Sequence, residues 1–135
     1  MIISAINNCL AADTTLVSLS GKQSLDIYPN KGYDDDVSPI IIYFWLPSVV
    51  NIHQYWMRQD SILYRIVDTD AERCFAMGDR IIELLAQSTS PRTTIQSNLY
   101  VVKWIKFVDS KNLEPEQYEG FYHLSLKFDI GYVKL

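Results

Sequence analysis

The chain has 135 residues, enough to bury a hydrophobic core and too few for two ordinary domains. Hydrophobic residues make up 48% and charged residues 21%, a composition that excludes disordered and membrane-embedded proteins. The formal net charge is −4 and the pI about 5.0, so there is no basic excess with which to neutralise phosphates. We therefore expect one domain over residues 1–135 that does not recognise DNA or RNA directly.

The N-terminal segment does not have the pattern of a signal peptide. It lacks a basic region, and Asn7 and Asn8 interrupt its apolar residues. The longest strongly apolar stretch, Ile40 to Leu46, has the length of a strand and falls short of the roughly 18 residues of a membrane-spanning helix. We therefore expect no membrane partner.

The first helix is predicted over residues 2–12, because its apolar residues recur on one helical stripe. These residues are Ile2, Ile3, Ile6, Cys9 and Leu10. Asp13 and Thr14 are candidate N-caps for a second, short helical turn that ends at Gly21. A brief strand over 25–28 and a polar loop over 29–38 follow.

The run Ile40 to Leu46 is β-branched and aromatic without polar alternation, which predicts a strand covered on both faces. Residues 51–68 also favour extended structure and would pair with that strand in a long β-hairpin. The hairpin would reach past the next helix and leave strand edges open. Open edges can pair with another chain, and head-to-tail pairing of subunits can close into a ring.

The clearest helix is predicted over residues 71–87, with Asp68, Thr69 and Asp70 as candidate N-caps. Its predicted apolar face consists of Ala71, Cys74, Phe75, Gly78, Ile81, Ile82 and Leu85. A strand is predicted over 98–108. Alternation places Tyr100, Val102 and Trp104 on one of its faces, and Leu99, Val101, Ile105 and Phe107 on the other. After a polar loop over 109–119, a last strand over 122–132 alternates apolar with polar residues, which predicts one face toward water.

These elements predict an α+β fold. We expect a twisted, mainly antiparallel sheet of about four to five strands. The long helix would pack on one face of this sheet, and the N-terminal helix and a projecting β-hairpin would complete the fold.

The sequence contains no pattern typical of a metal or nucleotide site. His53 and His123 lack ligand spacing with another His, Cys or carboxylate. The run Asp34-Asp35-Asp36 lacks the alternating ligands and glycine turn of a calcium loop, and Ser20-Gly21-Lys22 lacks the upstream glycine of a P-loop. We expect no metal and no cofactor.

Candidate catalytic groups are equally sparse. Cys9 and Cys74 fall on apolar helix faces, which favours buried reduced thiols over a nucleophile or a disulfide. His123 lies on the polar face of the last strand, where an exposed structural histidine is expected. Glu114 and Glu116 lie in a polar loop, where carboxylates more often solubilise than catalyse. We therefore expect that the chain is not an enzyme and has no catalytic residues.

Aromatic residues reach 13%, with nine tyrosines and three tryptophans, which is more than a small core needs. Several crowd the predicted hairpin, and Tyr and Trp suit surfaces that become buried on association. The predicted subunit interface consists of Tyr43, Trp45, Tyr55, Trp56 and Tyr64. The alternative is that these side chains fill the faces of the sheet.

Five segments follow one another in a recognisable layout. They are Leu10-Ala11-Ala12-Asp13, Thr15-Leu16-Val17, Ile27-Tyr28-Pro29, Ser38-Pro39-Ile40-Ile41-Ile42-Tyr43, and Leu63-Tyr64-Arg65-Ile66-Val67-Asp68 leading into the helix from Ala71 to Leu85. This layout resembles the tail-terminator and neck proteins of tailed bacteriophages, the tail-completion family. The resemblance covers about residues 2–87 and, more loosely, the last two strands.

The resemblance implies a homohexameric ring in the tail or neck of a virion, assembled in the host cytoplasm. Such a ring stops polymerisation of the tail tube and docks the tube to the head. Its partners would be further copies of the chain, the tail-tube protein and a head-completion or connector protein. DNA would pass through the lumen without specific binding, which the acidic net charge fits.

Two alternatives stay open. The chain could be a small ligand-binding domain or enzyme with a pocket between the long helix and the sheet, drawing on Tyr64, Cys74 and His123. It could also be an adaptor subunit of a related contractile machine, which would differ only in its partners.

Overall fold

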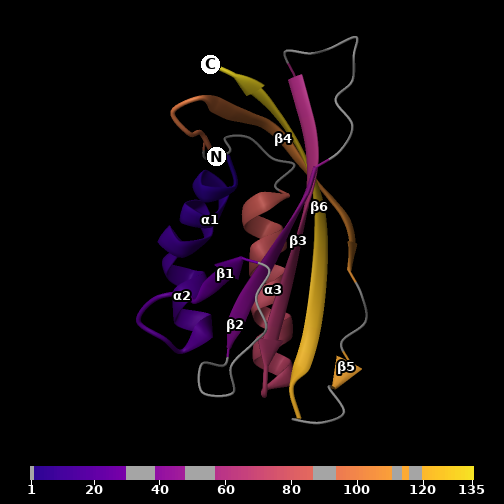
Figure 1. Cartoon of the computed structure of the whole chain (residues 1–135). Helices are drawn as coiled ribbons and strands as arrows, with labels where there is room; N and C mark the ends of the chain where they lie inside the picture. Colours follow the sequence, from indigo (N-terminus) through magenta and orange to yellow (C-terminus); the bar gives the residue numbers. More distant parts are fainter. Residues whose placement is uncertain (1, 30–38, 48–56, 87–93, 111–113, 116–119) are drawn as a thin grey trace.

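The computed structural model describes residues 2–29, 39–47, 57–86, 94–110, 114–115 and 120–135. Its helices lie on one face of a twisted sheet, which is called the helix face below, and the opposite face is called the outer face (Figure 1). The helices are α1 (Ile2–Ala12), α2 (Thr14–Ser20) and α3 (Ala71–Leu85). The strands are β1 (Ile27–Pro29), β2 (Ile40–Pro47), β3 (Met57–Asp68), β4 (Tyr100–Ser110), β5 (Glu114–Pro115) and β6 (Tyr122–Lys134). The predicted α+β class is confirmed.

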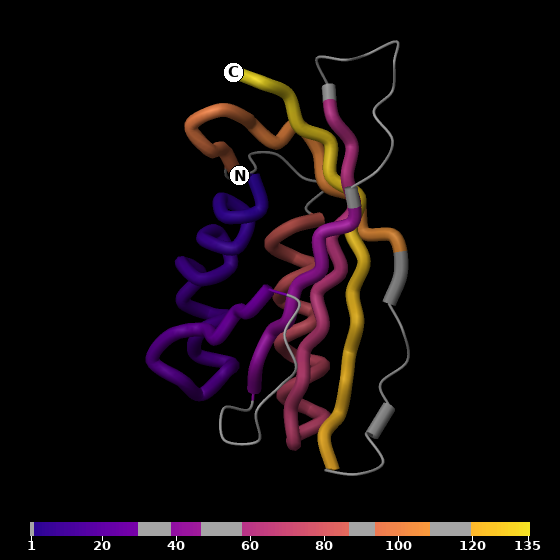
Figure 2. The backbone as a smooth tube through the Cα atoms, in the orientation of Figure 1, coloured from indigo at the N-terminus to yellow at the C-terminus, as the bar shows by residue number. Residues whose placement is uncertain are grey.

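The strand order in the sheet is β1-β2-β3-β6-β4, and the short β5 also pairs with β6. Strands β1 and β2 are parallel, and every other pair is antiparallel. The β2–β3 ladder runs from Ile40 opposite Val67 to Pro47 opposite Asp60, which confirms the predicted hairpin. Residues 51–56 of the predicted second strand lie outside the described residues. The end of the hairpin projects past α3 along the strand direction (Figure 2).

Side-chain caps define where two of the helices begin. Asp13 caps α2 by accepting from the Leu16 N–H at 2.8 Å, and α2 ends at Gly21, whose φ of 72° suits a residue without Cβ. Asp70 caps α3 by accepting from two backbone N–H groups of the first turn. Of the candidate caps, Asp13 and Asp70 are therefore confirmed, whereas Thr14 is the first residue of α2 and neither Asp68 nor Thr69 is the N-cap of α3.

Two bidentate ion pairs connect α3 to the end of β3 and to the cap of α2. Arg73 donates to both carboxylate oxygens of Asp68, each at 2.6 Å, where β3 ends. Arg80 donates to both oxygens of Asp13, each at 2.9 Å, and thereby joins α3 to the cap of α2. These hydrogen bonds from Arg80 lower the pKa of Asp13. The helices are therefore held to one another as well as to the sheet.

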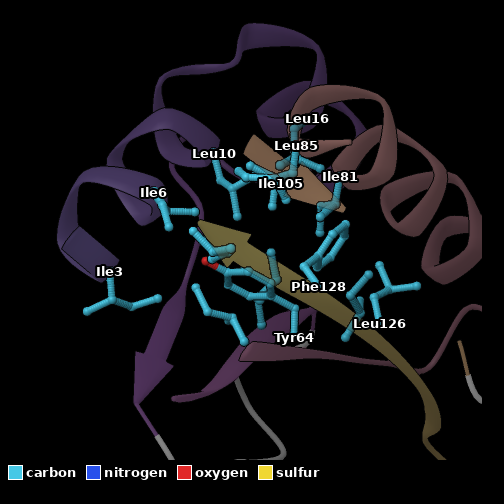
Figure 3. Packing of buried hydrophobic residues seen from close by; sticks show 14 of the residues in the cluster. Ile3, Ile6, Leu10, Leu16, Tyr64, Ile81, Leu85, Ile105, Leu126 and Phe128 are labelled. Carbon is cyan, nitrogen blue, oxygen red and sulfur yellow. The ribbon is translucent and has the colours of Figure 1, made fainter. Parts of the chain in front are cut away.

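The main core lies between the helices and the helix face of the sheet. Tyr64 and Phe128 fill its centre below Ile6, Leu10 and Leu85 (Figure 3). A second, smaller cluster on the outer face consists of Ile40, Ile42, Val67 and Phe121. Strand β2 is thus covered on both faces at Ile40–Ile42, as its continuous apolar run predicts.

The buried stripe of α3 differs from the predicted one: Ala71 and Ile82 are only half-buried, and Phe75 lies outside it. Its buried residues are Cys74, Met77, Gly78, Ile81 and Leu85, whereas Phe75 is 49% exposed. Phe75 follows Cys74 by one residue, a rotation of about 100° that carries it off the sheet-facing stripe. The assignment of Phe75 to the core was wrong, and Met77 takes that place.

Strand β4 also departs from the predicted alternation. Its pairing with β6 shifts register between Val102 and Trp104, which marks a β-bulge. The extra residue puts Tyr100, Val102, Ile105 and Phe107 on the helix face and turns Trp104 to the outer face. The prediction that Trp104 shares a face with Tyr100 was therefore wrong.

The outer face of β6 is less open than its polar residues suggest. Ser125 is only 4% exposed, and Gly131 is buried. The Arg65 guanidinium lies 5.3 Å from the centre of the Phe44 ring, and its Nε donates to Ser125 at 3.3 Å, so this side chain covers part of the strand. His123 is half-buried rather than exposed. In addition, the predicted loop over 109–119 contains β5, which pairs with the start of β6.

Candidate functional site

The structure places three of the five predicted interface residues, and all three lie on the helix face. Tyr43 is half-buried, and its ring centre lies 6.5 Å from that of Tyr64. Trp45 is half-buried at the projecting end of the hairpin. Tyr55 and Trp56 lie outside the described residues. The interface itself stays a prediction.

Tyr64 is a core residue. It is 0% exposed, and burial raises the pKa of its hydroxyl well above the usual value. The hydroxyl donates to Asn7 Oδ1 at 2.7 Å, so the side chain ties β3 to α1 across the core. Tyr64 therefore packs in the core under the hairpin, whereas Tyr43 and Trp45 retain some exposed surface.

A cluster of aromatic and charged side chains lies at the base of the projecting hairpin. The Tyr132 hydroxyl donates to Asp60 Oδ2 at 2.5 Å, and Asp60 is only 7% exposed. Burial and this hydrogen bond raise the pKa of Tyr132. Trp45 and Tyr100 pack on Tyr132 with ring centres 6.3 and 5.2 Å away, and Arg58 lies 5.5 Å from the centre of the Tyr100 ring. The base of the hairpin is therefore held by specific contacts.

Trp104 is a surface feature that the sequence pattern did not reveal. A Cβ built on Gly131 would lie 2.2 Å from two atoms of the Trp104 indole, so the indole occupies the space directly above Gly131 on the outer face. Trp104 is half-buried and keeps part of its ring exposed. A glycine within a strand often marks such a close approach, and this was the available signal.

The side chains proposed for a helix–sheet pocket do not converge. Tyr64 and Cys74 belong to the core on the helix face, whereas His123 pairs opposite Val67 and lies on the outer face. Burial raises the pKa of the Cys74 thiol to about 12, so the thiol stays protonated at neutral pH. Its Sγ donates to the Ile66 carbonyl at 3.6 Å. Cys74 is thus suited to packing rather than to nucleophilic chemistry.

Two adjoining open hollows, of about 440 and 360 Å³, lie between α1 and residues 94–99. They share Ala5, Asn8 and Gln96 in their lining. Asp13, at the edge of the larger one, is held by Arg80 and is not available as a free carboxylate. Cys9, which also lines the larger hollow, is half-buried, and neither Cys9 nor Cys74 is in a disulfide. The hollows are open grooves rather than enclosed cavities.

In the described part of the chain, no three His, Cys, Asp or Glu side chains are grouped so that they could hold a metal ion. None of the helices within it is by itself long and apolar enough to cross a membrane, and only α1 and α2 together, bent by 72°, meet both criteria.

No protein-family model matches the sequence, and no curated protein matches it. Solved structures do match the fold. One of them is a chain in the virion of a native gene transfer agent (GTA) particle, with a TM-score of 0.74. The match covers 98% of this chain and 93% of that chain, at 12% sequence identity. The two chains share one fold. Since the match spans nearly all of both, the likeness includes the helices, the sheet and their order.

Proposed function

We propose that this chain is a structural virion protein that forms a hexameric ring at the junction of head and tail. The observation that carries the proposal is the fold shared with a GTA virion chain over 98% of this chain. The sequence layout, which resembles tail-terminator and tail-completion proteins, supports the same assignment and suggests the position in the particle. The ring would end the tail tube and dock it to the head connector.

The contacts of such a ring would include the projecting hairpin. Its base is stiffened by the Tyr132–Asp60 hydrogen bond and by the rings around it, so the hairpin can hold a defined direction. Tyr43 and Trp45 retain exposed surface there, and the predicted Tyr55 and Trp56 follow in the segment between the two strands. Large aromatic side chains that become buried on association are typical anchors of protein interfaces.

The role would be mechanical rather than catalytic. The buried thiol of Cys74 stays protonated and is suited to packing. In the ring, DNA would pass through the lumen without specific binding. The assembled protein would reside in the virion, after assembly in the host cytoplasm.

The test is to mix the purified chain with tail tubes assembled from the tube protein encoded beside its gene. Negative-stain electron microscopy should show a sixfold ring at one end of each tube, and tubes should stop growing when the chain is added. Trp45→Ala should reduce the fraction of capped tubes, because it removes an anchor of the predicted interface.

The matched control is Tyr122→Ala, which removes a half-buried aromatic side chain. Tyr122 lies at the end of β6 that is far from Tyr132, the residue on which Trp45 packs. It should cap tubes as the unchanged chain does. A chain that stays monomeric, leaves tube ends bare and has no effect on tube length would contradict the proposed function.

A further inference from the structure

The side of α3 that faces away from the sheet has an acidic surface. Glu72, Phe75, Asp79 and Glu83 are all exposed, and their spacing of three and four residues lines them up along the helix. Among the described residues, neither Glu72 nor Asp79 takes part in an ion pair, and Glu83 contacts only Arg80. We name these four residues the acidic face. It consists of one large apolar side chain among three carboxylates.

The outer face of the sheet carries two lysines next to the carboxylate of Asp129. Lys106 lies opposite Asp129, and Lys127 lies on the same face, because their neighbours Ile105, Phe107, Leu126 and Phe128 point into the core. Neither lysine takes part in an ion pair with any residue whose side chain the structure describes. Trp104 and Leu46, which is 43% exposed, supply apolar surface on this face. We name Leu46, Trp104, Lys106 and Lys127 the Trp104 face.

The two faces point in opposite directions. All the described helices pack on the helix face, and α3 turns its acidic side away from the sheet, whereas the Trp104 face lies on the far side of the sheet (Figure 1). A surface on one side of a subunit that complements a different surface on its other side gives a head-to-tail contact. Such contacts form a closed ring when the rotation between subunits allows it.

We propose that the acidic face of one subunit docks on the Trp104 face of the next copy of the chain. Phe75, the apolar centre of the acidic face, would pack against Trp104, the apolar centre of the Trp104 face. Glu72 and Asp79 would meet Lys106 and Lys127 at the rim. Apolar anchors inside a rim of complementary charges are the usual anatomy of an interface, and the charges also orient the approaching subunits.

This contact deepens the proposed function, on which it rests, by naming the two surfaces that join neighbouring subunits. It adds a second contact to the hairpin and involves different residues. Because both surfaces come from the same chain, the contact can be tested by exchanging charges between them.

The experiment uses two complementary variants. The first, Lys106→Glu with Lys127→Glu, has two acidic faces, and the second, Glu72→Lys with Asp79→Lys, has two basic faces. Each variant alone should associate roughly 100-fold more weakly than the unchanged chain, since like charges then meet at every contact. An equimolar mixture should recover assembly, because every contact between unlike variants again joins opposite charges.

Native mass spectrometry, with the variants isotopically distinguished, should show mixed oligomers with equal numbers of the two. Circular dichroism and thermal unfolding check that each variant is folded, and recovery in the mixture is independent evidence of folding. The matched control is Lys134→Glu, an exposed lysine of β6 on the helix-face side of the strand, which should assemble normally.

Four results would overturn the inference. If each variant assembles like the unchanged chain, or the mixture fails to recover although both variants are folded, the subunits meet elsewhere and the proposed ring still stands. If the variant with Lys106→Glu and Lys127→Glu assembles normally but loses binding to a DNA duplex that the unchanged chain binds, the Trp104 face is a nucleic-acid surface instead. If the unchanged chain forms no oligomer, alone or on tail tubes, the proposed function fails together with the contact.

Discussion

Trp104 packs on Gly131, so Gly131→Ala should change the free energy of unfolding in opposite directions with Trp104 present and with Trp104 removed. A Cβ at position 131 would lie 2.2 Å from Cε2 and Nε1 of the indole and 2.7 Å from Cζ2, so the ring would have to move. Crowding of this kind costs about 1–3 kcal/mol. Alanine is favoured over glycine within a strand by about 0.5–1 kcal/mol. Gly131→Ala should therefore lower the free energy of unfolding by about 1–2 kcal/mol.

The same substitution should have the opposite effect once the indole is removed. In a Trp104→Ala background the methyl group added at position 131 occupies vacated space, and only the strand preference remains. Gly131→Ala should then raise the free energy of unfolding by about 0.5–1 kcal/mol. Urea denaturation of the four proteins, followed by circular dichroism, measures both steps and the coupling between them.

Gly120→Ala is the control. Its φ of 70° penalises any side chain, but an added Cβ would meet no atom within 4 Å. It should destabilise the chain by about 1 kcal/mol whether or not Trp104 is present. If Gly131→Ala is neutral or stabilising while Trp104 is intact, the indole does not lie over Gly131, and the description of the Trp104 face is wrong.

Three further predictions concern buried polar groups. Tyr132→Phe removes the donor to buried Asp60 and should lower the free energy of unfolding by about 1–3 kcal/mol in urea denaturation. Arg80 lowers the pKa of Asp13, so the stability that this pair contributes is present above about pH 4. It is lost as the pH falls through the lowered pKa. The difference in unfolding free energy between the unchanged chain and Arg80→Ala should therefore shrink over that range. Cys74, whose pKa is raised to about 12, should resist iodoacetamide at pH 8 until urea unfolds the chain, as followed by mass spectrometry.

Each of these has a result that would count against it. A Tyr132→Phe chain as stable as the unchanged one would mean that the hydroxyl is replaced by another donor. A stability difference for Arg80→Ala that stays constant from pH 7 to pH 2 would show that Asp13 does not carry the effect. Labelling of Cys74 in the folded chain at the rate seen in urea would contradict its burial.

The sequence was sufficient for elements whose signal is local. Asp13 and Asp70 precede their helices with a side chain that can accept from the first turn, and both act as caps. The continuous apolar run of β2 correctly indicated cover on both faces, because no polar side chain there requires solvent. The strand order, with β6 between β3 and β4, depends on long-range pairing, and local patterns do not determine it.

The candidate surfaces were less predictable for the same reason. Trp104 was assigned to the wrong face because a bulge adds one residue to β4, and the side chains after the bulge then change face. Phe75 was assigned to the core because it is apolar, although its angular position on α3 points it away from the sheet. Tyr64 looked like the other hairpin aromatics in sequence, but its register puts it under α1.

The position of β6 has a consequence for synthesis. Strand β6 follows β3 and β4 in the chain, yet it lies between them in the sheet and forms long ladders with both. A nascent chain that has already made the β2–β3 hairpin must therefore wait for residues 122–134 before β3 and β4 have their partner. Such non-local pairing slows folding and leaves strand edges exposed meanwhile. The Trp104–Gly131 contact also forms only then, so a chain that has not finished folding lacks the packed Trp104 face.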